Sequence, residues 1–262
     1  MPRRLIFAAV AVIAATGPAP AAELRSVEAD GTQFKVTLSD GSVLRSPQLA
    51  GAVLTVTARG ETLRLRIDGV ELDPDAKRGE VWLHTLSAQG DNGAWRNPCE
   101  AGPDGRQQAF PLAGRARRPD GLFGRAEPGT FELTCTAGAQ GKCVRFGYLP
   151  WEGEVMLAHY NACIRMVRAD YCGNGTPHTR DGTLIDVYDK QGIQMPDPGD
   201  ELQFEAAWGA AGAICVRRVR IPETYSLDAL RRDCPHLKPE DIGEGCTEAR
   251  MSKMPAAQLL NL

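Results

Sequence analysis

The feature that most constrains this chain is its set of eight cysteines, which all lie between Cys99 and Cys246 and follow an apolar N-terminal segment. An even number of cysteines behind such a segment is typical of exported proteins, whose thiols are oxidised to disulfides. The sequence contains no Cys-x-x-Cys pair, so the usual zinc-ribbon and thioredoxin-like arrangements are absent. We therefore expect all eight to form disulfides: Cys99, Cys135, Cys143, Cys163, Cys172, Cys215, Cys234 and Cys246.

Residues 1–22 have the layout of a secretory signal peptide. Arg3 and Arg4 precede an apolar run over residues 5–16, and small residues and prolines follow as far as Ala21 and Ala22. The run is shorter than the about 20 residues that span a bilayer, so we expect no transmembrane anchor. Cleavage near Ala21 or Ala22 would leave an exported protein, periplasmic or extracellular. The paired arginines fit a Sec or a twin-arginine signal, and we favour Sec.

The charge of the chain argues against nucleic acid as a partner. Lys and Arg number 30 against 33 Asp and Glu, a net charge of −3, and loss of the leader removes two further arginines. A nucleic-acid-binding surface requires an excess of basic groups.

Residues 23–92 lack cysteine and predict a small N-terminal antiparallel β unit. Phe34 and Val36 alternate with polar neighbours, as do Leu65 and Ile67, which is the period of half-buried strands. Asp30-Gly31 and other Gly-containing pairs punctuate these runs at hairpin positions.

Residues 93–262 contain every cysteine and predict a disulfide-rich α+β module. Strands are expected over residues 109–112, 131–135, 143–148, 184–188, 202–208 and 214–221. One main helix is expected over residues 153–170, where Met156, Tyr160, Cys163 and Val167 fall on one face. The fold class is therefore α+β and β-dominant.

The cysteine spacing restricts the pairing but does not settle it, because eight cysteines allow roughly a hundred connectivities. Within one helix, Cys163 and Cys172 would lie about 13 Å apart. A disulfide needs Cα atoms about 4.4 to 6.8 Å apart, so these two should bond elsewhere. Cys234 and Cys246 flank a short loop-like segment and are the favoured local pair.

A distinctive motif occupies residues 168–173, Arg-Ala-Asp-Tyr-Cys-Gly, and continues through Pro177-His178-Thr179 and Asp181-Gly182-Thr183 to residues 186–189. This segment resembles the ADYC-domain family of exported bacterial proteins. The likeness extends less strongly to Cys135, Cys143 and residues 204–208, and so covers about the second half of the chain. The resemblance supports export, and it implies no reaction, ligand or catalytic residue.

The chemistry-bearing candidates cluster around the same motif. His178, Asp181 and Asp186 could act in acid and base catalysis or hold a metal, but their spacing matches neither an EF-hand loop nor His-Glu-x-x-His. We expect no resident metal or cofactor. The candidate binding residues are Tyr171, Asn174, His178, Asp181 and Trp151.

Two functional classes remain. The first is a binding or interaction module of the cell envelope, with an envelope protein or a glycan as partner. The second is a metal-assisted or acid/base hydrolase centred on His178 and Asp181. We favour the binding module, because the chain has no nucleophile motif such as Gly-x-Ser-x-Gly.

Overall fold

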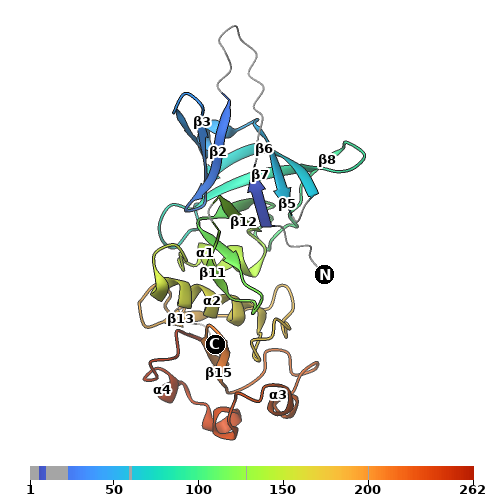
Figure 1. Cartoon of the computed structure of the whole chain (residues 1–262). Helices are drawn as coiled ribbons and strands as arrows, with labels where there is room; N and C mark the ends of the chain where they lie inside the picture. Colours follow the sequence, from blue (N-terminus) through green and yellow to red (C-terminus); the bar gives the residue numbers. More distant parts are fainter. Residues whose placement is uncertain (1–5, 10–22, 59–60, 128, 200) are drawn as a thin grey trace. The chain divides into compact units, whose positions relative to one another are not determined.

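The computed structural model describes residues 6–9, 23–58, 61–127, 129–199 and 201–262. It contains two compact units, one of Met1–Arg117 with Gly124–Arg145 and the other of Arg118–Phe123 with Phe146–Leu262 (Figure 1). The leader lies outside the described residues except for Ile6–Ala9, which forms strand β1. Export and cleavage remain predictions.

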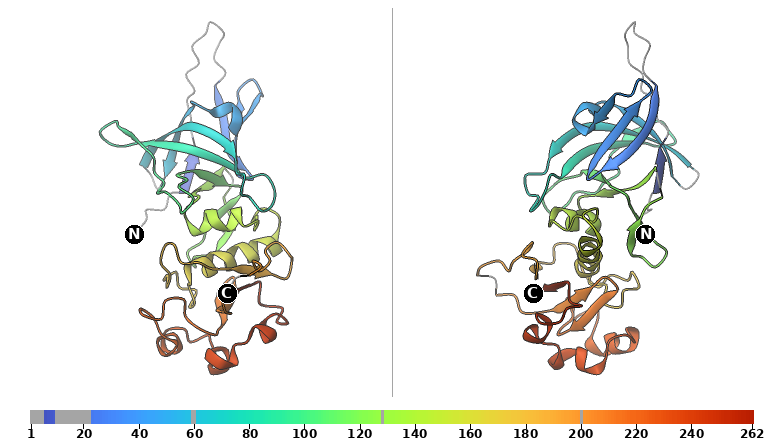
Figure 2. Two further views of the ribbon diagram at one scale, coloured as in Figure 1. Left: turned by 180° about the vertical axis from the view of Figure 1, so that it is seen from behind. Right: turned by 60° about the vertical axis from the view of Figure 1, so that its left-hand side comes forward.

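The main sheet of the first unit closes on itself (Figures 1 and 2). Its strands run in the order β6-β5-β1-β12-β9-β7-β8, and β6 also pairs with β7. Their bounds are β1 Ile6–Ala9, β5 Val53–Ala58, β6 Glu61–Leu72, β7 Trp82–Gln89, β8 Trp95–Arg96, β9 Ala109–Leu112 and β12 Thr130–Cys135. Leu65 and Ile67 of β6 point into the core, as their alternation with arginines predicts.

A second sheet of three strands, in the order β2-β3-β4, belongs to the same unit. These strands are β2 Leu24–Asp30, β3 Gln33–Leu38 and β4 Val43–Arg45, and the 3-10 turn η1 Ser46–Leu49 follows them. Phe34 and Val36 are buried in the same core as β5 and β6. The expected N-terminal β structure is therefore confirmed.

The first unit extends well past the expected boundary at residue 92. Strand β9 pairs with both β7 and β12, which draws these later residues into the closed sheet. Strands β10 Arg115–Arg117 and β11 Phe123–Arg125 form a separate two-stranded sheet.

Helix α1 Ala139–Arg145 replaces the strand expected over residues 143–148, and that prediction was wrong. Cys143 and Val144 are buried, so a short apolar run fits a helix as well as a strand. Gly141 sits in this helix because a Cβ there would overlap the carbonyl oxygen of Cys135.

The second unit packs one main helix on a small antiparallel sheet. Helix α2 Glu154–Arg168 contacts β14, β15 and β16 (Figure 2). The sheet order is β13-β16-β14-β15, with bounds Val187–Asp189, Leu259–Asn261, Ala206–Gly209 and Gly212–Val216. Short helices complete the unit: α3 Leu227–Asp233, η2 Pro239–Asp241, η3 Gly243–Gly245 and α4 Glu248–Met251. The β-dominant α+β class is confirmed.

All eight cysteines are disulfide-bonded. Cys99 pairs with Cys135, Cys172 with Cys234 and Cys215 with Cys246, and Cys143 and Cys163 are also in disulfides. The favoured local bridge between Cys234 and Cys246 was therefore wrong. Ile242 pairs with Val216 of β15 in an isolated parallel β-bridge, which brings Cys246 to Cys215. Cys234, at the end of α3, instead bonds to Cys172 just after the end of α2.

Within the part of the chain that the structure describes, no helix is long and apolar enough to span a membrane.

Candidate functional site

Residues 169–173 of the motif follow directly after helix α2, which ends at Arg168. Ala169 adopts the left-handed conformation, with φ 48° and ψ 42°, and its N–H donates to the Met166 carbonyl at 2.9 Å. The N–H of Asp170 donates to the Arg165 carbonyl at 2.9 Å. A left-handed residue at this position is a common way to end a helix and satisfy its last carbonyls. Ala169 is fully buried, so the turn is part of the core.

Asp170 connects the helix to the loop that follows. Its Oδ2 atom accepts from Arg165 Nη1 at 2.6 Å and from the N–H of Gly175 at 2.9 Å. Both side chains of the ion pair are buried, with exposed fractions of 4% for Arg165 and 0% for Asp170. Among the described residues, the other carboxylate oxygen, Oδ1, has no hydrogen-bond partner.

Tyr171 anchors the motif in the core and is not accessible to a partner. Its hydroxyl donates to Glu205 Oε1 at 3.1 Å and accepts from the N–H of Arg220 at 2.8 Å. Glu205 and Arg220 form a bidentate buried ion pair, with N–O distances of 2.9 and 3.0 Å. Burial raises the pKa of Tyr171 well above its usual value, and the Glu205 carboxylate adds to the rise. Tyr171 is therefore a protonated structural residue.

Cys172 and Gly173 hold the backbone in place directly after Tyr171. Cys172 is bonded to Cys234, and the N–H of Ala213 donates to the Tyr171 carbonyl at 2.9 Å. Gly173 has φ +69°, and a Cβ on it would overlap the carbonyl oxygen of Ala211. Each residue of the motif is thus used inside the fold.

The following segment, residues 173–181, is named here the signature loop. Its backbone is held at Gly175, whose carbonyl accepts from Arg168 Nη2 at 2.7 Å, and at His178, whose N–H donates to the Arg168 carbonyl at 3.0 Å. Between and beyond these points its exposed side chains are Asn174, Thr176, Pro177, Arg180 and Asp181. The loop is therefore fixed in its backbone and open to solvent in its side chains.

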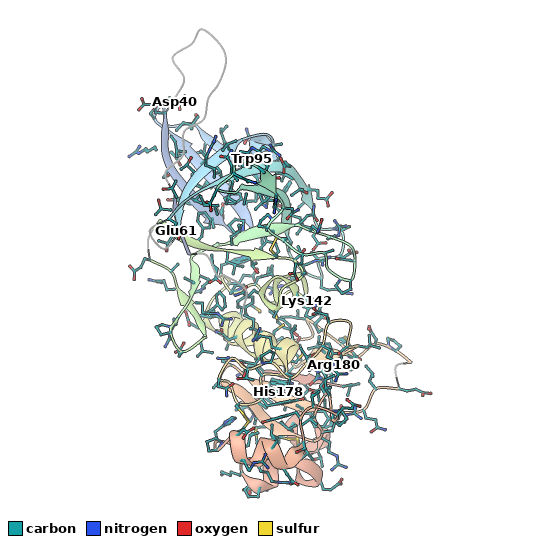
Figure 3. All side chains as sticks on the ribbon, turned by 90° about the vertical axis from the view of Figure 1, so that its right-hand side faces the viewer. Asp40, Glu61, Trp95, Lys142, His178 and Arg180 are labelled. Carbon is teal, nitrogen blue, oxygen red and sulfur yellow. A yellow bond between two sulfur atoms is a disulfide. The ribbon has the colours of Figure 1, made fainter. Side chains whose placement is uncertain are left out.

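His178, which is labelled in Figure 3, is half-buried, and its ring packs against that of Tyr225. Its ring lies 3.8 Å from that of Tyr225 at an interplanar angle of 22°, and Tyr225 donates to Asp233 Oδ2 at 3.1 Å. Burial lowers the pKa of His178, while the charges of Asp170 and Asp233 oppose that shift. The imidazole is consequently neutral at pH 7.

The three catalytic candidates have different surroundings. Asp181 is exposed, whereas Asp186 is buried and its Oδ2 accepts from the N–H of Asp197 at 2.9 Å. The carboxylates that act on the pKa of His178 are those of Asp170 and Asp233. Over the ranges that the structure describes, no group of three or more His, Cys, Asp or Glu side chains is arranged to hold a metal ion.

Of the remaining binding candidates, Asn174 is exposed and Trp151 is half-buried in a turn before α2. Sequence reasoning missed the partners of the motif: Arg165, Glu205, Arg220 and Asn261. Asn261 donates to Glu205 Oε2 at 3.0 Å. No local pattern marks these residues, because their roles depend on contacts between distant segments.

Two concave surfaces of the second unit lie apart from the signature loop. One, of about 420 Å³, is lined by residues that include Glu154, Val155 and Lys190. The other, of about 490 Å³, is lined by residues that include Phe204 and Arg218. Neither lining contains a residue of the signature loop.

No curated protein and no solved structure has significant similarity to this chain. The family model of the ADYC domain matches residues 46–222. The match includes the motif and begins further toward the N-terminus than the likeness noted in the second half of the sequence. The chain is a member of the ADYC domain family.

Proposed function

We propose that this protein is an exported binding module of the cell envelope, and that the signature loop is its recognition surface. The observation that carries the proposal is that the buried Asp170 and the partly buried Arg168 hold the loop backbone while five of its side chains stay exposed. Binding residues are often placed on loops that a rigid scaffold positions.

Rigidity favours binding because a loop already in its bound conformation loses little entropy when a partner docks. The Cys172–Cys234 bridge and the Gly175 contacts restrict the signature loop in the free protein. Its exposed side chains offer an amide, a hydroxyl and charges of both signs, from Asn174, Thr176, Arg180 and Asp181. These groups suit hydrogen bonding to an envelope protein or to a glycan.

Export is supported by the leader pattern of residues 1–22 together with the oxidised state of all eight cysteines. Disulfides persist in oxidising compartments and are rare in the cytosol.

The test compares three forms of the exported chain, immobilised and exposed to solubilised envelope proteins and to envelope glycans. The loop variant carries Asn174→Ala and Thr176→Ala. The control carries Glu223→Ala and Lys253→Ala, which are also exposed polar positions of the second unit. We expect one component that the wild type and the control retain and the loop variant releases, with affinity reduced about tenfold or more. Equal retention by all three forms, or by none, would refute the proposal.

A further inference from the structure

The closed sheet of the first unit depends on β1. This strand pairs with β12 on one side and with β5 on the other, both antiparallel. The other pairings around the closed sheet are β5-β6, β6-β7, β7-β9 and β9-β12, so among the described residues β1 alone joins β5 directly to β12.

Ile6–Ala9 belongs to the leader that we expect to be cleaved on export, so the inference below rests on the proposed function. Adjacent strands lie about 4.8 Å apart, so removal of β1 leaves β5 and β12 about 9.6 Å apart, too far to pair with each other. Residues 56–58 of β5 and 130–132 of β12 then present backbone N–H and C=O groups that have lost their partners. An opening one strand wide, bordered on both sides by such groups, is a site for strand addition.

We infer that the exported protein binds an extended segment of a partner polypeptide in this slot, antiparallel to both β5 and β12. The slot is defined by the residues opposite β1: Val56, Thr57 and Ala58 of β5, and Thr130, Phe131 and Glu132 of β12. The pairing register of β1 shows the direction and the length of segment that fit.

The residues that border the slot determine which segment it selects. The position of Phe7 lies opposite Phe131, which is 2% exposed and meets Phe34 edge-on at 5.7 Å in the core. The position of Ala9 lies opposite Val56, which is 1% exposed. The position of Ala8 lies between Thr57 and Thr130, neither of which is buried.

Residues directly opposite each other in a sheet share a face. The occupant therefore needs apolar residues at the two positions opposite Phe131 and Val56, and it tolerates any side chain between them. The partner is thus an extended polypeptide with an apolar-x-apolar segment.

The experiment begins with the full chain, expressed with its own leader in an exporting bacterial host, and the intact mass of the exported product locates its N-terminus. A fluorescent peptide with the sequence of residues 3–11 is then titrated against that product by anisotropy. Two control peptides carry Ala8→Pro, which removes one backbone N–H and keeps both apolar positions, or Phe7→Asp, which keeps the backbone. Hydrogen exchange is followed in residues 53–58 and 130–135.

We expect cleavage near Ala22, saturable binding of the parent peptide, slower exchange along both edges, and a higher Tm at saturation. Each control peptide should bind with an affinity at least about tenfold lower than that of the parent peptide. Retention of β1 in the exported protein, equal binding of the parent and Ala8→Pro peptides, or edges already protected without peptide would each overturn the inference. Failure of the chain to reach the exported fraction contradicts the proposed export, whereas a cleaved leader without peptide binding contradicts the strand slot alone.

Discussion

Replacing Gly173 with alanine should destabilise the second unit far more than the same replacement at Gly175. Both glycines have positive φ, +69° and +88°, so both variants lose about 1 to 2 kcal/mol from the left-handed conformation. Alanine also restricts the unfolded chain, which returns up to about 1 kcal/mol in each case. The conformational contributions therefore nearly cancel between the two variants.

The difference lies in the space around each Cα. A Cβ on Gly175 has nothing within 4 Å, whereas a Cβ on Gly173 would overlap the Ala211 carbonyl oxygen and lie 2.7 Å from its carbon. The turn between β14 and β15 must then move, which strains the bond from the Ala213 N–H to the Tyr171 carbonyl. Overpacking of this kind costs about 1 to 3 kcal/mol, and a lost hydrogen bond about 1 kcal/mol. We expect Gly173→Ala to lower the free energy of unfolding by about 3 kcal/mol more than Gly175→Ala.

Urea unfolding with the disulfides intact measures the difference. It is followed by tryptophan fluorescence, to which Trp208 contributes from the core beside Tyr171, since the two rings lie 5.3 Å apart. The midpoint concentration should fall clearly for Gly173→Ala and slightly for Gly175→Ala at a similar slope. Equal midpoints for the two variants would show that the turn between β14 and β15 moves without any loss of unfolding free energy, and would refute the steric reasoning.

Asp170→Asn removes one charge of a buried ion pair and should lower the free energy of unfolding by about 3 kcal/mol or more, whereas Asp228→Asn, in an exposed pair, should change it by less than about 0.5 kcal/mol in the same urea titration. Burial lowers the pKa of His84 to about 4 from 6.5, so the unfolded chain binds the proton more readily than the folded one. Neutral His84 therefore contributes about 3 kcal/mol to the free energy of unfolding above about pH 6.5, and this contribution is lost as the pH falls toward 4. His84→Gln should therefore flatten the dependence of the unfolding free energy on pH between about pH 4 and 6.5. An unchanged dependence would contradict the assignment of this pH effect to His84. Removing the Cys172–Cys234 bridge by double alanine substitution opens a loop with a sequence separation of 62 and should lower stability by about 4 kcal/mol, measured as a fall in Tm. A fall no larger than for a surface substitution would mean that packing alone holds the signature loop.

The sequence predicts secondary structure best where a long, regular hydrophobic pattern fits only a strand or only a helix. The alternation at Phe34 and Val36 requires a strand with one face in the core, and the stripe through Tyr160 requires a helix. The run at Cys143 and Val144 is too short to separate the two periods, and it lies in a helix whose Gly141 packs closely against the Cys135 carbonyl.

The candidate site was located from the sequence but not understood from it. The motif identifies the segment, yet nothing local reveals that Tyr171 is buried or that Glu205 and Arg220 are its partners. Disulfide pairing was unpredictable for the same reason: Cys234 bonds to Cys172, with a sequence separation of 62, rather than to the nearby Cys246. Contacts between distant segments depend on the assembled fold, which no local pattern encodes.

The two bridges of the second unit interleave, because Cys215 lies between Cys172 and Cys234 and bonds beyond them to Cys246. A chain that is translocated from its N-terminus presents Cys215 before Cys234. An oxidase that joins cysteines in order of arrival would therefore give Cys172 the wrong partner. Under the proposed export, a chain oxidised in that order reaches its native pairing only by thiol–disulfide exchange, so we expect the yield of folded protein to fall in a host that lacks a disulfide isomerase.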